Sequence, residues 1–327
     1  MKKILITGGA GYVGAMLTPH FLHKGHHVTV LDLMIFGENV IKDHKNLTKV
    51  KGDIRDQKLL RELLIDIDII IHLACISNDP SYEMDPALGK SINYDSFRPL
   101  VEIAKERKVK RFIYASSSSV YGLKKERDVN ESVSLEPLTD YSKFKAKCED
   151  VLLQYKSNDF TPVIIRPATV CGFSPRQRLD LVVNILTNLA YHKRKISIFG
   201  GDQLRPNIHI KDMVRAYDLL VEAEKDKVSG EIFNAGYENQ TVKELANIVK
   251  SNIGEDVILE TTPTDDNRSY HISSKKIFSR LGFVTKFTIK DAVNELKAAF
   301  KEKKLINTLE NDLYFNIKKV NNFKMKL

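Results

Sequence analysis

The stretch "KKILITGGAGYVG", residues 2–14, decides the fold of the amino-terminal half of the chain. "KKILIT" is rich in β-branched residues, which is typical of a buried strand. Gly8, Gly11 and Gly14 follow as G-x-x-G-x-x-G, and apolar residues then recur with helical spacing from Met16 to Leu22. Such glycines let the backbone turn tightly and hold a pyrophosphate at the helix N-terminus, where free N–H groups favour negative charge. The stretch therefore predicts a strand, a phosphate-binding turn and a helix.

The next strand ends on a carboxylate. "HVTVLD" alternates apolar residues and ends on Asp32, about 20 residues after the glycines. A carboxylate there can accept hydrogen bonds from both ribose hydroxyls of a dinucleotide, although a strand-end turn residue is the alternative reading. The carboxylate also repels a 2'-phosphate, and neither Leu33 nor Met34 offers a cation to hold one. We therefore expect NAD as cofactor, bound at least about tenfold more tightly than NADP, or about 1.4 kcal/mol.

Further strands alternate with helical patterns. They are expected at 48–51, 68–74, 111–116 and 161–170, and the longest helix at about 85–107. Ile- and Val-rich strands alternating with helices are typical of a parallel sheet covered on both faces. We predict an α/β fold with a Rossmann-type, doubly wound parallel sheet and a smaller carboxyl-terminal substrate-binding domain.

The expected boundaries place the NAD-binding domain at 1–170, with a returning segment at about 205–236. The substrate-binding domain takes 171–204 and 237–303, and residues 304–327 form a tail that we expect to dock on the body or on a second subunit. "GDIRD" places Asp53 and Ile54 where they can bracket an adenine, although an ordinary turn explains Gly52 and Asp53 nearly as well.

Composition narrows the class of partner. No apolar run approaches the roughly 20 residues that span a bilayer, so we expect a cytoplasmic protein without a membrane partner. The net charge of +9 could suit nucleic acid, an anionic membrane surface or a phosphorylated small substrate. The positive charge is dispersed and no nucleic-acid module accompanies it, which favours an anionic metabolite. Three scattered cysteines without a C-x-x-C pair predict neither a disulfide framework nor a metal site.

Four Tyr-x-x-x-Lys pairs occur, and such a pair can place an ammonium near a phenol on one helical face. They begin at Tyr121, Tyr141, Tyr191 and Tyr314. Only the pair of Tyr141 and Lys145 lies on a new helix about two dozen residues after "ASSSSVYG", which ends a predicted strand. Strand ends at the carboxyl edge of a parallel sheet are where ligands bind, so Ser117 and Tyr141 can share one crevice.

At this point the chain resembles the extended short-chain dehydrogenase/reductase family, in particular its NAD-dependent sugar-nucleotide epimerases and dehydratases of the UDP-glucose 4-epimerase type. The resemblance runs from Lys2 to about Phe300. It rests on "TGGAGYVG", "GDI", "HLA", "SSSSVYG", "RPATVCG" and "RPNIHIKD" together with Asp32, Asn93, Tyr141, Lys145 and Arg268.

The resemblance implies a role for each matching residue. Tyr141 would be the catalytic base, Ser117 would hydrogen-bond the reacting oxygen, and Lys145 would hold the nicotinamide ribose and lower the pKa of Tyr141. The cofactor-binding residues would be Gly8, Gly11, Tyr12, Val13, Gly14, Asp32, Asp53, Ile54, Leu73, Ala74, Asn93 and Lys145. The substrate-binding residues would be Ser117, Thr169, Arg176, Arg178, Arg205 and Arg268, with Arg205 and Arg268 clamping a diphosphate.

The chain also departs from the family. Dehydratases carry an Asp-Glu pair directly after the catalytic Ser or Thr, and here Ser118 and Ser119 occupy those places. "RPATVCG" and "RPNIHIKD" differ from many relatives at Thr169, Cys171 and Asn207, which indicates a remodelled sugar pocket.

We therefore expect an NAD-dependent sugar-nucleotide epimerase that transiently oxidises C4 of the sugar of a nucleotide-diphosphate sugar. The alternatives are a C4 dehydrogenase, for example of a GDP-heptose, that releases a 4-keto sugar, and a non-catalytic NAD(H)-binding regulator. The resemblance also implies a homodimer formed by the helices at 85–107 and 140–155.

Overall fold

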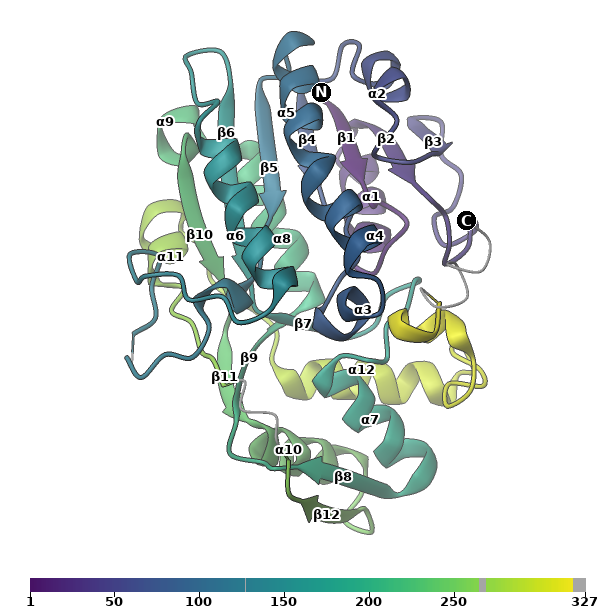
Figure 1. Ribbon diagram of the computed structural model, residues 1–327. Coiled ribbons are helices and arrows are strands. Elements are labelled where there is room, and N and C mark those ends of the chain that lie inside the picture. Colours follow the sequence, from purple (N-terminus) through teal and green to yellow (C-terminus); the bar gives the residue numbers. More distant parts are fainter. Residues whose placement is uncertain (127, 265–268, 320–327) are drawn as a thin grey trace.

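The computed structural model describes residues 1–126, 128–264 and 269–319. Its largest feature is a sheet of seven parallel strands in the order β10-β6-β5-β4-β1-β2-β3 (Figure 1). The strands are β1 (Lys3–Thr7), β2 (His27–Asp32), β3 (Leu47–Lys51), β4 (Ile69–His72), β5 (Arg111–Ala115), β6 (Thr161–Pro167) and β10 (Glu231–Ala235). The chain order reverses between β1 and β4, and in such sheets the crevice beyond the carboxyl ends at this point binds ligands.

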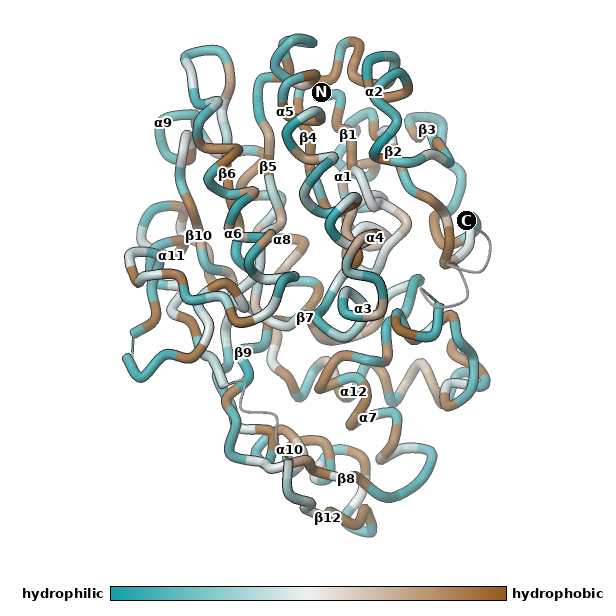
Figure 2. Tube along the Cα trace, in the orientation of Figure 1, coloured by the Kyte–Doolittle hydropathy of each residue, from teal (hydrophilic) through white to brown (hydrophobic). Residues whose placement is uncertain are grey.

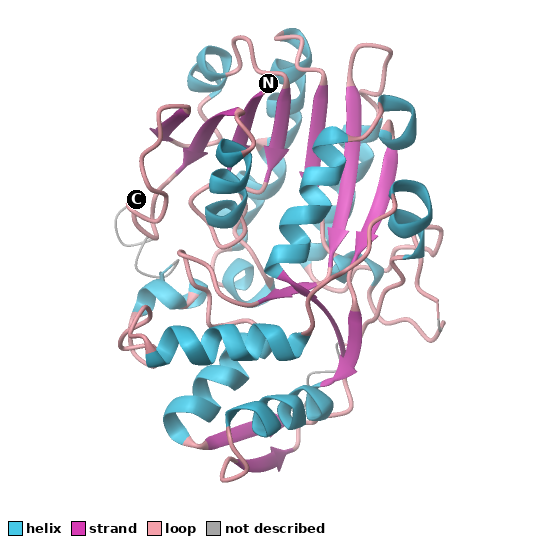
Figure 3. Cartoon of the chain, turned by 180° about the vertical axis from the view of Figure 1, so that it is seen from behind, coloured by secondary structure: helices cyan, strands magenta, loops and turns pink. Residues whose placement is uncertain are grey.

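Helices cover both faces of this sheet, as Figures 1 and 3 show from opposite sides. One face carries α2 (Gln57–Leu63), α5 (Phe97–Glu106) and α6 (Asp140–Leu153), and the other carries α1 (Gly14–His23) and α8 (Ile210–Glu222). The central strands β1 and β4 are mostly buried Ile and Leu, whereas the edge strand β3 is partly exposed. Hydrophobic and hydrophilic residues alternate along the helices (Figure 2). Burial on both faces explains why the central strands read as continuous apolar runs. The predicted doubly wound α/β fold is confirmed.

A smaller layer lies beyond the carboxyl ends of the large sheet (Figure 1). It contains the three-stranded sheet β11-β9-β7 and the parallel pair β12 and β8. Its strands are β7 (Thr169–Cys171), β8 (Lys195–Phe199), β9 (Leu204–His209), β11 (Glu238–Thr241) and β12 (Ile258–Thr262). Its helices α7 (Val182–Lys193), α10 (Val242–Ile253) and α12 (Ile289–Lys301) pack on one another around a separate apolar cluster.

The described chain also contains four short α-helices, α3 (Asp79–Glu83), α4 (Pro86–Lys90), α9 (Lys225–Val228) and α11 (Lys275–Leu281), and 3-10 turns at Ser118–Tyr121 and Asp312–Tyr314. In the described ranges, every helix is too short or too polar to cross a lipid bilayer.

Two predicted elements are interrupted in the structure. The helix expected at 85–107 is α4, then a π-helical turn at Ser91–Asp95, then α5. The wider turn carries Asn93, whose side chain accepts a hydrogen bond from the Ile76 amide at 2.8 Å and donates one to the Ile76 carbonyl at 3.0 Å. A π-turn in a helix often marks such a local requirement.

The strand expected at 161–170 is likewise two strands. β6 ends at Pro167 in the large sheet, and β7 begins at Thr169 in the small one. Between them, the amide of Ala168 donates to the carbonyl of Ala235 at 2.8 Å, which keeps the chain attached to β10 as it changes sheets. One sequence run therefore crosses from one layer to the other.

The described part of the tail packs on the body. Leu305 and Thr308 are buried, and Tyr314 and Phe315 join an apolar cluster with Leu179. The Leu179 amide donates to the Tyr314 carbonyl at 2.8 Å. Of the two expected docking sites, the body and a second subunit, these contacts agree with the body. Residues 320–327 of the tail lie outside the described residues.

A buried ion pair ties α6 to the large sheet. Arg166 of β6 makes a bidentate contact with Glu149 of α6, at 3.0 and 2.6 Å, and both side chains are 3% exposed. Glu149 also accepts a hydrogen bond from Ser116, at the end of β5. Arg166 donates further to Tyr121, whose hydroxyl donates to Asn234 of β10, both at 2.8 Å. Four elements thus meet at one polar network below the crevice.

We expect Glu149→Gln to lower the free energy of unfolding by about 3 to 5 kcal/mol, because it leaves the Arg166 charge buried without its partner. Denaturant unfolding measures this loss. The matched control is Glu260→Gln, which breaks an exposed pair with Lys195 and should cost less than about 1 kcal/mol. Similar losses in the two variants would contradict the structural role of the buried pair.

Candidate active site

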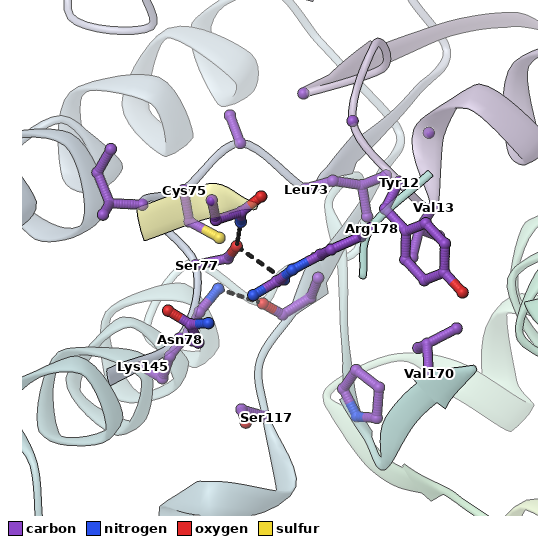
Figure 4. Close-up of a pocket in the computed structure, with 18 of the residues that line it drawn as sticks. Tyr12, Val13, Leu73, Cys75, Ser77, Asn78, Ser117, Lys145, Val170 and Arg178 are labelled. Atoms are coloured by element: carbon purple, nitrogen blue, oxygen red, sulfur yellow. Dashed lines mark hydrogen bonds between the residues drawn. The ribbon is translucent and has the colours of Figure 1, made fainter. Parts of the chain in front are cut away.

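One pocket lies where the two layers meet, beyond the carboxyl ends of the large sheet. It is lined by loops after β1, β2, β4 and β5, by α6, and by the segment that follows β7. Most of the predicted site residues line it, namely Gly8, Gly11, Tyr12, Val13, Gly14, Asp32, Asp53, Ile54, Leu73, Ala74, Ser117, Tyr141, Lys145, Thr169, Arg176 and Arg178. Figure 4 shows Ser117, Lys145 and Arg178 around this space.

The glycine loop forms the floor of the pocket. Gly8 has a φ of +72°, and a Cβ there would lie 2.7 Å from the Ala74 amide nitrogen. A Cβ on Gly14 would lie 2.5 Å from the Gly9 Cα atom. Only glycine fits such positions without moving the backbone, so the loop can pass directly beneath a ligand phosphate.

Tyr12 fastens this loop to the smaller layer. Its hydroxyl donates to the Gly172 carbonyl at 2.6 Å and accepts from the Asn184 side chain at 3.1 Å. The Ser174 hydroxyl donates to the Tyr12 carbonyl at 2.8 Å. The loop that would carry the cofactor phosphates is therefore held by residues that come 160 or more positions later in the chain.

Asp32 closes the β2 side of the pocket. Its carboxylate accepts hydrogen bonds from the amides of Ala10 and Met34, at 2.9 and 2.8 Å. Burial raises the pKa of Asp32, while these two hydrogen bonds and the charge of Arg176 oppose the rise. Each carboxylate oxygen keeps a lone pair for a ribose hydroxyl. The sequence reading found no cation beside Asp32 because Arg176 approaches from another part of the chain.

Two predicted cofactor residues, Asn93 and Asp53, are held by neighbouring protein groups. Asn93 does not itself line the pocket, but it holds Ile76, which does. Asp53 lines the pocket, yet its carboxylate is engaged by the Arg55 guanidinium at 2.6 Å, whereas the adjacent Ile54 is buried at the pocket wall. Of this pair, Ile54 is the better placed to contact an adenine ring.

Lys145 and Tyr141 lie on α6 and Ser117 follows β5. The Lys145 ammonium donates to the Ala115 carbonyl at 2.7 Å and lies 5.8 Å from the centre of the Tyr141 ring. The Ser117 hydroxyl shares a 2.8 Å hydrogen bond with the hydroxyl of Ser119. The three predicted catalytic side chains thus face one pocket, with an ammonium near a phenol.

The groups around Tyr141 shift its pKa. Burial raises its pKa well above the ordinary value of 10, and the charges of Cys75 and Asp79 add to the rise. Arg178 and the Asn78 amide oppose it. In this pocket the charge of Arg178 favours the phenolate form of Tyr141.

Arg176 and Arg178 come from the loop after β7 and are 3% and 8% exposed. Arg178 donates to Asp180 at 2.6 Å and to the Ser77 hydroxyl at 3.0 Å, a contact drawn in Figure 4. The Arg176 guanidinium lies 3.5 Å from the centre of the Phe36 ring. Burial and then the charge of Arg178 lower the pKa of Arg176 to about 9. The Arg176 Nε and an Arg178 Nη atom have no hydrogen-bond partner, so the pair is suited to an anion.

The structure describes only one of the two expected diphosphate clamps, Arg205 and Arg268. Arg205 lies outside the pocket lining, with its guanidinium 5.3 Å from the ring centre of Tyr270, which does line the pocket. Arg268 lies outside the described residues.

Sequence reasoning missed several pocket residues, among them Phe36, Ser77, Tyr270 and Asn316. Ser77 follows the carboxyl end of β4, so the strand-end rule could have found it. Asn316 lies in the tail, where no motif singles it out. In the described ranges, no group of three or more His, Cys, Asp or Glu side chains could hold a metal ion.

Comparison with known proteins identifies the family. The NAD dependent epimerase/dehydratase family model matches residues 4–236. A dTDP-D-glucose 4,6-dehydratase of Dictyostelium discoideum is 31% identical over 258 residues, which cover 72% of this chain and 58% of that protein. An uncharacterized UDP-glucose epimerase of Bacillus subtilis is 32% identical over 263 residues, covering 76% of this chain and 81% of that protein.

A solved structure agrees with these relatives. UDP-glucuronic acid 4-epimerase from Bacillus cereus, in complex with UDP-glucuronic acid and NAD, superposes with a TM-score of 0.84 at 26% identity. The match covers 92% of this chain and 99% of that one. The glycine loop without room for a Cβ, the Asp32 carboxylate and the buried arginines fit NAD. The chain therefore belongs to the NAD-dependent epimerase/dehydratase family, with NAD as its cofactor.

Proposed function

We propose that this protein is a sugar-nucleotide epimerase that transiently oxidises the C4 hydroxyl of its substrate. Bound NAD supplies the hydride acceptor. Tyr141 takes the hydroxyl proton, Ser117 hydrogen-bonds the same oxygen, and Lys145 holds the nicotinamide ribose. The observation that carries the proposal is the meeting of these three side chains with the glycine loop and Asp32 in one pocket.

The residues after Ser117 favour epimerisation over dehydration. Elimination of water across C5 and C6 needs an acid and a base, and the two places that carry them in dehydratases are Ser118 and Ser119. Ser118 is 3% exposed, and the Ser119 hydroxyl is engaged by Ser117. Neither hydroxyl is an effective acid or base near neutral pH.

The carboxylates in the described pocket lining already have hydrogen-bond or ion-pair partners in the protein. They are Asp32, Asp53 and Asp79. Of these three carboxylates, Asp79 is the one whose charge raises the pKa of Tyr141. It accepts a hydrogen bond from Thr139, the residue that caps the start of α6. Its position supports a role in holding α6 rather than in eliminating water.

The arginine pair supports an anionic substrate as well as an anionic cofactor. Arg178 and Tyr141 line the same pocket, and the charge of Arg178 opposes the rise in the pKa of Tyr141. A nucleotide-diphosphate sugar carries the negative charge that buried guanidinium groups prefer. We propose this substrate class, with Arg178 and Thr169 on the substrate side.

Tyr141→Phe should lower turnover to less than about a tenth of the wild-type rate, because it removes the proton acceptor. NAD affinity should stay within about threefold, less than 1 kcal/mol, since the ring and Lys145 remain. Steady-state assays on accepted sugar nucleotides and NAD titration measure the two effects. The control is Tyr191→Phe, which alters another Tyr-x-x-x-Lys pair and should leave turnover unchanged.

The fate of the hydrogen at C4 separates epimerase from dehydrogenase. An epimerase must return the hydride within one visit of the sugar to the site. Substrate deuterated at C4 should therefore give product that keeps its label at C4 with inverted configuration, without an added oxidant, as mass spectrometry and NMR can detect. A released 4-keto sugar, with NADH left on the protein, would instead support the dehydrogenase.

The expected homodimer stays a prediction, and one surface feature favours it. Tyr94 of the π-helical turn and Phe144 of α6 are half-buried, with ring centres 5.0 Å apart. Light scattering should report about twice the chain mass of 37.3 kDa. Phe144→Glu should then give a monomer, whereas Phe278→Glu, on exposed α11, should not. A monomeric wild-type protein would exclude the dimer.

A further inference from the structure

The tail crosses from the smaller layer to the wall of the cofactor pocket. Asn316 is 7% exposed and lines the pocket together with Asp32, Phe36 and Arg176. These three neighbours form its β2 side, where the carboxylate of Asp32 fits an adenosine ribose. A residue near the end of the chain therefore borders the adenosine end of the cofactor site.

The side chain of Asn316 bonds to two residues that line the pocket. Its side-chain oxygen accepts a hydrogen bond from Arg176, and its side-chain nitrogen donates to the Ser77 hydroxyl at 2.7 Å. Its backbone amide donates to Asp180 at 2.9 Å. Ser77 and Asp180 are also the two acceptors of Arg178. One side chain thus connects both buried arginines to the tail.

These contacts fix where the arginines point. Among the described residues, the Arg176 side chain donates one hydrogen bond, to Asn316, and its guanidinium lies on the Phe36 ring. Two buried cations so close together repel each other, and a partner must hold each in place. The side-chain oxygen of Asn316 accepts a hydrogen bond from Arg176, and the carboxylate of Asp180 accepts one from Arg178. Without Asn316, Arg176 would lose its fixed position beside Asp32.

We propose that Asn316 is a positioning residue of the cofactor site, through which the tail forms one wall of the pocket and slows the release of NAD(H). Asp32, Phe36, Arg176 and Asn316 border the same pocket, so a loss of the Arg176 position would weaken the contacts that hold the adenosine end of the cofactor. The apolar contacts of Tyr314 and Phe315 with Leu179 hold the tail in place on the far side. The proposal concerns the cofactor alone, so it stands whether the sugar reaction is epimerisation or dehydrogenation.

Release of NADH tests the proposal directly. Protein loaded with NADH is mixed with excess NAD in a stopped-flow instrument, and the loss of bound-NADH fluorescence gives the dissociation rate. Asn316→Ala should release NADH about tenfold faster or more, because it removes a hydrogen bond to a charged group. A rate within about twofold of wild type, less than 0.5 kcal/mol, would overturn the proposal.

Two further variants separate positioning from general loosening of the tail. Asn316→Asp keeps an oxygen acceptor for Arg176 and loses the donation to Ser77, so it should release NADH more slowly than Asn316→Ala. Release as fast as that of Asn316→Ala would overturn the Arg176 contact. Ile317→Ala alters the neighbouring exposed residue and should behave like wild type. Equal acceleration in Ile317→Ala would show that the tail acts only through its packing. Melting temperatures near wild type establish that each variant is folded.

Discussion

The bidentate contact between Arg166 and Glu149 is the interaction on which the arrangement of the site depends. Helix α6 lies on the outside of the large sheet, yet it carries Tyr141 and Lys145, which must face the pocket at the end of that sheet. The buried pair fixes the rotation and the height of α6 relative to β6, and Ser116 extends the same network to β5. Ser117, one residue further on, is thereby placed opposite the helix.

The pocket is formed by two layers, which contribute residues from different parts of the chain. The large sheet supplies the glycine loop, Asp32 and the strand ends, as its parallel topology requires. The smaller layer supplies two buried arginines, and Tyr12 holds the glycine loop to that layer through Gly172 and Ser174. Movement of the smaller layer would therefore disturb both the cation pair and the phosphate loop.

Burial has opposite consequences for the two kinds of charge in this pocket. It raises the pKa of Tyr141 and so disfavours the phenolate that a base requires. It also leaves guanidinium donors unpaired, which draws anions into the same space. Arg178 relates the two effects, because its charge opposes the rise in the pKa of Tyr141. The site thus balances a buried base against neighbouring cations, as many active sites do.

The sequence by itself determined the doubly wound sheet, the glycine loop, the Asp32 position and the choice of Tyr141 among four similar pairs. These follow from local periodicity and from the rule that parallel strand ends share one edge, so no distant contact is needed. The tertiary structure decided what depends on contacts between remote segments. It placed Arg176 beside Asp32, Asn316 against Arg176, and the π-helical turn that lets Asn93 hold Ile76. The Asn93 and Asn316 contacts join residues 17 and 140 positions apart. No repeat or spacing in the sequence records them, because these side chains meet only after the layers have packed.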